Sequence, residues 1–203
     1  MDILKGKRLI LGSASPRRKE LLQGLNIDFK VDACTDFKER IPSGIPPREV
    51  PARLAEGKSL GFHRPLEADE WLLTADTVVI IPDAEGKDGG RILGKPRSED
   101  EACAMLRALS GRWHEVVSAV TLRGPDGALQ TCSDVARVHF KTLSEEEIAC
   151  YVRTCRPLDK AGAYGIQEWI GLIGIDRIEG SFYTVMGLPV HRVYGMLGAD
   201  PSA

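Results

Sequence analysis

A run of small and basic residues near the start of the chain, 12–18, has the composition of an anion-binding segment. Ser15 is a good helix N-cap and Pro16 a good first helical residue, so we expect a strand that turns directly onto a helix. Amides at a helix N-terminus bind phosphate, and arginine adds forked hydrogen bonds. The residues expected to cradle a polyphosphate are Ser13, Ser15, Arg17 and Arg18. The alternative is a solvated helix start with two surface arginines.

A single carboxylate stands inside the strongest β-strand pattern of the chain. Asp76 lies in the stretch 71–81, followed by Thr77 and two valines. Aspartate is disfavoured in strands and costly to bury without a partner, so we expect Asp76 at the carboxyl end of its strand, facing a cation, a metal or a water. In that position it can act as a general base. The alternative is an aspartate that only binds backbone amides where the strand turns.

Two lysines and one glutamine have surroundings that suit a nucleotide. Lys95 is held in a Gly-Lys-Pro turn after a predicted strand, and Lys58 lies late in a predicted helix. Lysine binds phosphate as a mobile point charge, although most lysines are only solvated. Gln167 ends a small-residue stretch, 157–167, and its amide can read a base edge with one donor and one acceptor. The composition of the stretch 157–167 alone also fits an ordinary loop.

The sequence lacks the motifs of several other chemistries. It contains no G-x-x-x-x-G-K-[ST] phosphate loop, no G-x-S-x-G serine motif and no H-x-x-x-H metal motif. The five cysteines are odd in number, have no C-x-x-C spacing and have no histidine at metal-ligand spacing. They predict scattered reduced thiols in an intracellular protein.

Apolar periodicity and turn residues predict a mixed α/β chain that positions these groups. Expected strands cover 8–11, 71–81, 91–93, 116–122, 129–140 and 172–175. Expected helices begin at Pro16, near Val50, after Ser98, after Ser144 and at Pro189. The helix over 50–60 is the least regular, because Pro51 must occupy its first turn and Gly57 costs about 1 kcal/mol relative to alanine.

Size and charge narrow the function classes. The chain has 203 residues, of which 43% are hydrophobic, so it can bury a large core as one domain over residues 1–203. Lys and Arg total 27 against 29 Asp and Glu, and this balance gives no basic field for a nucleic-acid polymer or an anionic membrane. No apolar run is long enough for a signal peptide or a membrane span, so a cytoplasmic protein is expected.

The order of these segments resembles the Maf family of nucleotide pyrophosphatases. Matching blocks are LGSASPRRKELL at 11–22, ADTVV at 75–79, GKP at 94–96, LSGR at 109–112 with His114, DKAGAYGIQ at 159–167 and GLP at 187–189. They extend over nearly the whole chain in the family's order. The resemblance implies a long mixed β-sheet flanked by helices, similar to inosine triphosphate pyrophosphatases, with two lobes around a central cleft and often a homodimer.

The resemblance also implies a reaction and roles for residues. A nucleoside triphosphate is hydrolysed between its α and β phosphates with a divalent cation, Mg²⁺ or Mn²⁺. Asp76 matches the general base, and Lys58 and Lys95 match lysines that hold phosphate. Arg17 and Arg18, with the loop from Ser13 to Ser15, match the triphosphate cradle. Glu39, the one survivor of a usual Asp-Glu pair, is a candidate metal or water contact beside Asp76.

Arg17, Thr77 and Gln167 match the branch of the family that is similar to dTTP and UTP pyrophosphatases. A glutamine suits a pyrimidine, since uracil and thymine each present a carbonyl and a ring N–H. Glu168 departs from the pattern, because the family more often has glycine there. Two other functions stay open: a house-cleaning pyrophosphatase for modified nucleotides, and a non-enzymatic nucleotide sensor that regulates septum formation.

Overall fold

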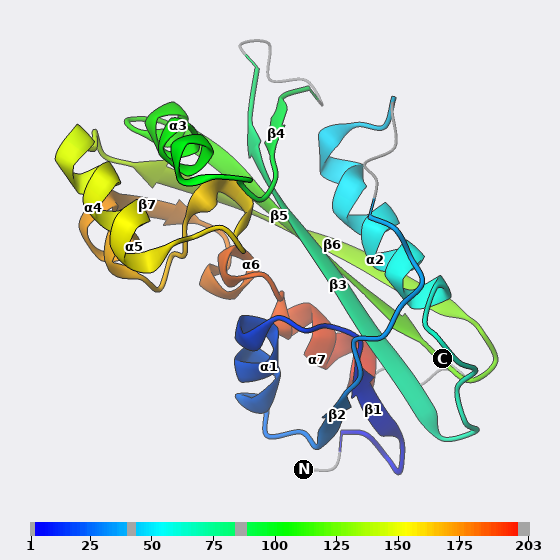
Figure 1. The fold of residues 1–203 in the computed structure, drawn as a ribbon. Helices are drawn as coiled ribbons and strands as arrows, with labels where there is room; N and C mark the ends of the chain where they lie inside the picture. The colour runs from blue at the N-terminus through cyan, green and yellow to red at the C-terminus, as the bar shows by residue number, and fades with distance from the viewer. Residues whose placement is uncertain (1–2, 40–43, 84–88, 199–203) are drawn as a thin grey trace.

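A mixed sheet runs through the protein (Figure 1), and the computed structural model describes residues 3–39, 44–83 and 89–198. The strands are β1 (Arg8–Leu11), β2 (Phe29–Val31), β3 (Glu70–Ile81), β4 (Arg91–Leu93), β5 (Trp113–Arg123), β6 (Leu129–Phe140) and β7 (Ile175–Glu179). Their order is β2-β1-β3-β5-β6-β7, and β4 pairs with the far end of β3. Strand β1 is parallel to β2 and β3, and the other pairs are antiparallel. The expected mixed α/β fold is confirmed.

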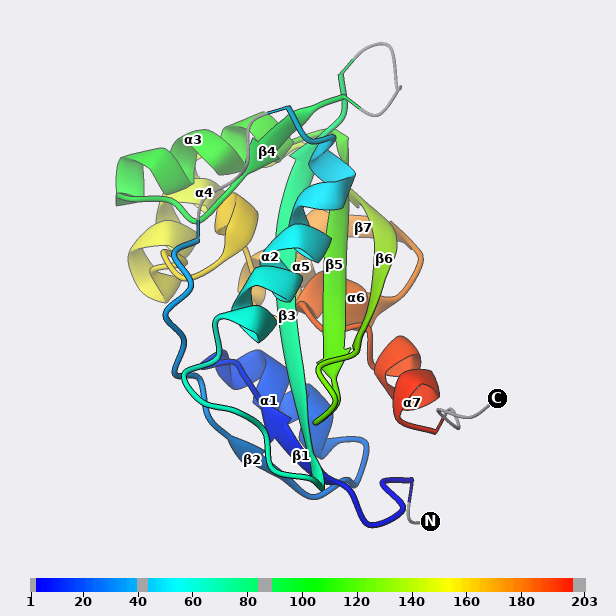
Figure 2. The ribbon, with the colours of Figure 1, turned by 90° about the vertical axis from the view of Figure 1, so that its right-hand side faces the viewer.

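Helices cover the two faces of this sheet unequally. They are α1 (Pro16–Gln23), α2 (Val50–Leu60), α3 (Glu99–Leu109), α4 (Glu145–Cys155), α5 (Trp169–Gly174), α6 (Phe182–Met186) and α7 (Val190–Gly198). Figure 2 shows α2 in front of β3 and β5, with α1, α5 and α6 behind the sheet. None of the helices in the described ranges is both long and apolar enough to cross a bilayer.

The expected helix starts are confirmed where a cap was predicted. Ser15 caps α1 by accepting a hydrogen bond from the amide of Arg18, and Pro16 occupies the first turn. Ser144 and Glu147 form a complete capping box on α4. Pro51 lies in the first turn of α2, where its missing N–H costs no hydrogen bond and its ring meets no preceding turn.

Side chains of β3 alternate between two separate environments, as the pleat of a strand dictates. Val78 and Ile80 pack on the α2 side, and Thr74 donates a hydrogen bond to the carbonyl of Ala55 in the same helix, 2.7 Å away. On the opposite face, Ala75 and Val79 belong to two different apolar clusters, one with β1, α1 and α7 and one with α3 and α4. These two clusters are separate apolar cores, and strand β3 contributes to both.

One edge of β3 is left without a strand partner at this midpoint. Strand β1 pairs with β3 only up to Leu73, and β4 begins its pairing at Val79. Asp76 lies in this interval. The expectation that Asp76 ends its own strand is therefore wrong: β3 continues to Ile81, and it is the neighbouring strand β1 that ends.

A second correction concerns the apolar stretch 172–175, which was expected to be a strand. Most of it belongs to α5, and strand β7 begins only at Ile175. A short apolar run cannot distinguish a buried strand from a buried helix. In the structure, Gly171 of α5 packs directly on the backbone of Ile166, and a Cβ at position 171 would stand 2.0 Å from the carbonyl oxygen of Ile166.

Candidate active site

A cavity of about 330 Å³ lies against the unpaired edge of β3. This volume is within the usual range for a small-molecule site. Its walls come from the start of α1, the end of α2, the turn after β4, the segment 159–167 and the end of α6. Because the cavity bends around the strand edge, it reaches side chains from both faces of β3: Asp76 on the α2 side and Thr77 on the other.

Asp76 and Glu39 converge on one ammonium group. The Nζ of Lys58 donates to Oδ1 of Asp76 at 2.6 Å and pairs with Oε1 of Glu39 at 2.8 Å. Asp76 is only 8% exposed, and its Oδ2 has no hydrogen-bond partner among residues 3–39, 44–83 and 89–198. Burial opposes ionisation of Glu39, but the hydrogen bond and charge of Lys58 outweigh it, so the pKa of Glu39 lies below its ordinary value.

Gly57 of α2 and its C-cap, Gly61, determine where Glu39 lies. A Cβ on Gly57 would stand 2.3 Å from the ring of Phe37, and one on Gly61 would stand 2.8 Å from the Cβ of Phe37. The helix surface is therefore shallow at this point, and the segment that carries Phe37 lies directly against it. Two residues later, that segment brings Glu39 to Lys58.

Arg18 connects three elements on the other face of the sheet. Its Nε donates to the carbonyl of Gly187 at 2.9 Å, and its Nη1 donates to the carbonyl of Ala75 at 2.8 Å. Its Nη2 donates to Oγ1 of Thr77 at 3.2 Å. Burial lowers the pKa of Arg18 from its ordinary value. Arg18 thus satisfies a carbonyl on the free edge of β3. Its Nη1 also donates to Oγ of Ser13 at 3.3 Å, so four of its five N–H donors are used within the described residues and one remains for a phosphate.

A chain of charged groups supports the opposite wall. Arg17 pairs with Asp159 at 2.8 Å, and Asp159 accepts a hydrogen bond from Lys160, also at 2.8 Å. Burial opposes ionisation of Asp159, but these two cations outweigh it and lower its pKa to about 2. Lys160 also pairs with Glu168 at 3.0 Å, and the carboxylate of Glu168 accepts a short hydrogen bond from the hydroxyl of Tyr151.

Two predicted substrate contacts, Lys95 and Gln167, line the cavity without an ion pair or hydrogen bond to another described residue. Lys95 is exposed at the turn after β4, and within the described part of the chain its ammonium has no hydrogen bond or ion pair. Gln167 is exposed at the rim, beside the buried backbone of Gly165. A free ammonium and a free amide in the lining of one cavity suit a ligand with an anionic end and a polar ring.

The cavity contains every predicted site residue except Ser13. This serine is buried in an adjoining hollow of about 360 Å³ that shares Ser15, Arg17, Arg18, Glu39, Lys58 and Lys95 with the main cavity. Sequence reasoning missed the pairing of Arg17 with Asp159 and the cavity position of Lys160. The adjacent Asp-Lys dipeptide was the available signal, but its partners lie far away in the sequence.

The oxygen donors fit a hard divalent cation. Glu39 and Asp76 already place carboxylate oxygens within hydrogen-bond distance of one ammonium, so the site accommodates positive charge between them. Mg²⁺ and Mn²⁺ prefer such oxygen ligands and complete their shells with water and phosphate. Among the described residues that line the cavity, Glu39 and Asp76 would be the ones to hold such a cation.

The fold and cavity together define an α/β protein with a cleft in which five basic and three acidic side chains face the same space. Comparison with known proteins shows the family to which the chain belongs. The family model for Maf-like proteins matches residues 8–199, and the chain therefore belongs to the Maf family.

Similar proteins include several called dTTP/UTP pyrophosphatase. One from Porphyromonas gingivalis is 49% identical over 201 residues, covering 97% of this chain and 96% of that one. Another from Phocaeicola vulgatus is 43% identical and covers 96% of each chain. The solved structure of the Staphylococcus aureus Ham1 protein aligns with 66% of this chain and 72% of its own, at 15% identity and a TM-score of 0.43.

Proposed function

We propose that this protein hydrolyses dTTP and UTP to the monophosphate and pyrophosphate. Its relatives of 38–49% identity carry that name over nearly their full length. The observation in the structure that supports the proposal best is the buried carboxylate of Asp76, held by Lys58 in a cavity rich in cations. A carboxylate with one free oxygen in such a place suits proton abstraction from water.

The proposed reaction uses each wall of the cavity differently. Asp76 takes a proton from water as the water oxygen bonds to the α-phosphorus, and the bond to the bridging oxygen breaks to release pyrophosphate. Arg17 and Lys95 bind the departing phosphates, while Arg18 adds positive charge and holds Thr77. Gln167 binds the pyrimidine edge. A divalent cation held by Glu39 and Asp76 supplies Lewis-acid stabilisation of phosphate charge.

A substrate panel tests this proposal. Each common and modified triphosphate is incubated with Mg²⁺ or Mn²⁺ in heavy-oxygen-labelled water, and the products are separated by chromatography. We expect monophosphate and pyrophosphate from dTTP and UTP, with the label in the monophosphate. Diphosphate and free phosphate, or label in pyrophosphate, would contradict it. Faster turnover of modified nucleotides supports the house-cleaning alternative, and tight binding without turnover supports the sensor.

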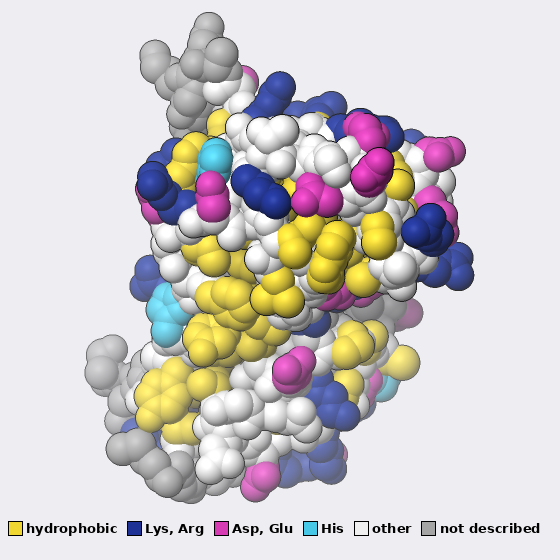
Figure 3. All heavy atoms as spheres, turned by 90° about the vertical axis from the view of Figure 1, so that its left-hand side faces the viewer, with side chains coloured by type: hydrophobic (Ala, Val, Ile, Leu, Met, Phe, Trp, Pro, Cys, Tyr) yellow, Lys and Arg dark blue, Asp and Glu magenta, His cyan; other side chains and the backbone are white. Residues whose placement is uncertain are grey.

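We also propose a homodimer in the cytoplasm. The five cysteines are all unpaired, as in proteins of reducing compartments. Figure 3, which faces α4 and α5, shows hydrophobic side chains in a band across the molecule. Leu172 on α5 is 78% exposed, and Trp169, Phe182 and Tyr183 are also exposed. Light scattering should give twice the chain mass, and Leu172→Glu should give the monomer; a wild-type monomer at high concentration contradicts this.

A further inference from the structure

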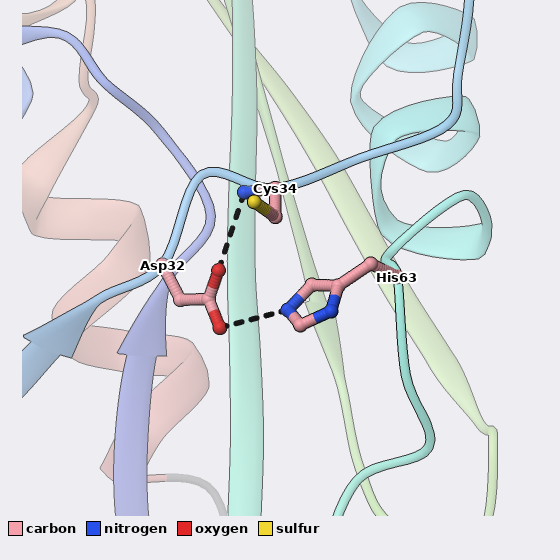
Figure 4. A group of neighbouring side chains, drawn as sticks. All are labelled: Asp32, Cys34 and His63. Carbon is pink, nitrogen blue, oxygen red and sulfur yellow. Dashed lines mark hydrogen bonds and ion pairs between the residues drawn. The ribbon is translucent and has the colours of Figure 1, made fainter.

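Three side chains with different donor atoms meet outside the cavity, between the segment after β2 and the segment after α2. They are Asp32, Cys34 and His63 (Figure 4), and one ligand atom of each lies within 4.8 Å of the others. Oδ2 of Asp32 is 3.0 Å from Nε2 of His63, and its Oδ1 accepts a hydrogen bond from the amide of Cys34 at 3.2 Å. Sequence spacing gave no sign of this group, because His63 is distant in the chain.

Backbone pairing holds the two segments in place. Thr35 and Phe62 form an antiparallel bridge, so the register sets Cys34 opposite His63 at the next position. Both Oγ1 of Thr35 and the amide of Asp36 donate to the carbonyl of Gly61, each at 2.9 Å. Phe62 is itself anchored in a small apolar cluster on the sheet. The three donors are therefore brought together by the fold and not by chance contact of mobile side chains.

We propose that Asp32, Cys34 and His63 bind a zinc-like divalent cation. Oxygen, thiolate sulfur and imidazole nitrogen are the donors that zinc accepts, and three protein ligands leave one tetrahedral position for water. The separation of the Asp32 and His63 donors is already close to the edge of a zinc tetrahedron, so the cation replaces the proton between them with little movement. This donor set differs from the all-oxygen pair Glu39 and Asp76.

Binding at this site should stabilise the wall of the neighbouring hollow. Ala33 and Thr35, which alternate with the ligands along the chain, line that hollow beside Ser13 and Lys58. The same segment continues to Glu39. A cation that links residues 32–34 to His63 should therefore also limit the motion of the segment 32–39, which lines the hollow. Because the cation binds the folded arrangement, it should raise the melting temperature.

Cobalt binding tests the proposal without any measurement of activity. Metal-free protein is titrated with Co²⁺, which gives a thiolate-to-cobalt charge-transfer band when sulfur is a ligand, and Zn²⁺ is then added as competitor. We expect one Co²⁺ per chain with this band, displacement by Zn²⁺, and a higher melting temperature with Zn²⁺. Cys34→Ser and His63→Ala should each abolish the band, whereas the matched changes Cys150→Ser and His191→Ala should preserve it.

The controls separate this site from the cavity. Asp76→Asn should leave the band unchanged, since its carboxylate belongs to the other site. A band that survives Cys34→Ser, a band lost in Asp76→Asn, or the absence of saturable thiolate binding would each overturn the proposal. Circular dichroism of each variant shows whether it is folded, and a conservative His63→Cys change should restore a band if the position ligates.

Discussion

The geometry around Asp76 couples the proposed base to a lysine. Lys58 occupies one carboxylate oxygen and leaves the other toward the cavity, so the lysine orients the base as well as adding positive charge. The same ammonium holds Glu39. A divalent cation held by the two carboxylates would compete with Lys58 and would leave its ammonium available for a phosphate oxygen. Lys58 thus links the proposed base Asp76 with the proposed metal ligand Glu39.

Asp76→Asn should retain nucleotide binding and lose turnover. The amide keeps the size of the carboxylate but cannot accept the proton from water, so kcat should fall by about 10²–10⁴-fold. Pyrophosphate release measures turnover, and titration with a non-hydrolysable triphosphate analogue measures binding. Turnover within a few fold of the wild type would remove Asp76 from the role of base.

Gln167→Ala should change the choice of base more than the rate. The lost amide removes about one hydrogen bond to the pyrimidine, so the preference for UTP over CTP should fall by about 3- to 10-fold in kcat/KM. Pyrophosphate release from the two nucleotides measures this ratio. A uniform loss on both would instead assign Gln167 to general binding or to loop structure.

At the scale of elements, the segment 159–167 depends on a residue that departs from the family pattern. Glu168 compensates the buried ammonium of Lys160 and accepts from Tyr151, whose hydroxyl in turn accepts from the amide of Gly165. Glu168 therefore supports Lys160 and Gly165, two residues that line the cavity. The backbone beside the expected pyrimidine position is held by this network.

Glu168→Gln should lower the free energy of unfolding by about 1–3 kcal/mol, because Lys160 loses one of its two anionic partners in a buried place. KM for triphosphate should rise as the loop loosens, while kcat changes less. Denaturant unfolding and steady-state kinetics give the two numbers. Glu146→Gln, at an exposed position of α4, is the matched control and should change neither.

Most elements could be predicted because their signals are local. The caps of α1 and α4, the Pro51 turn of α2 and the long strand β3 follow from neighbouring residues. Helix α5 was not predicted, since a short apolar run alone does not distinguish a buried helix from a buried strand, and the packing of Gly171 on the carbonyl of Ile166 appears only in the structure. The mid-strand place of Asp76 was missed for a similar reason: the end of β1, a different segment, opens the edge of β3.

At the scale of the whole molecule, the resemblance to one family predicted which residues share the cavity, but not their bonding. Nothing in the sequence placed Lys58 between two carboxylates or gave Arg18 two carbonyl acceptors, because these contacts join residues far apart in the chain. The cluster of Asp32, Cys34 and His63 was missed for the same reason.

His114 should make stability depend on pH. Burial lowers its folded pKa to about 3, below its ordinary value of 6.5, while its Nε2 is 2.7 Å from the hydroxyl of Tyr164. Between these values the unfolded chain binds the proton and the folded chain does not, so stability falls on acidification, by up to about 1.4 kcal/mol per pH unit. Above pH 6.5 this contribution is complete and constant.

Unfolding curves across this pH range, for the wild type and for His114→Gln, measure the effect. As pH falls from 6.5 to about 3, the wild type should lose unfolding free energy relative to His114→Gln, because only the wild type carries the buried histidine. His191→Gln, an exposed histidine, should follow the wild type. Parallel curves for His114→Gln and the wild type would show that burial does not suppress protonation of His114.

Replacing Gly57 by alanine should have opposite effects on helix stability and on the position of Glu39. Alanine there gains about 1 kcal/mol of helix propensity, yet its methyl group would collide with the Phe37 ring and carry Glu39 away from Lys58. A laboratory selection for heat resistance that favours good helix formers would therefore, at this single turn, weaken the proposed cation site of Glu39 and Asp76.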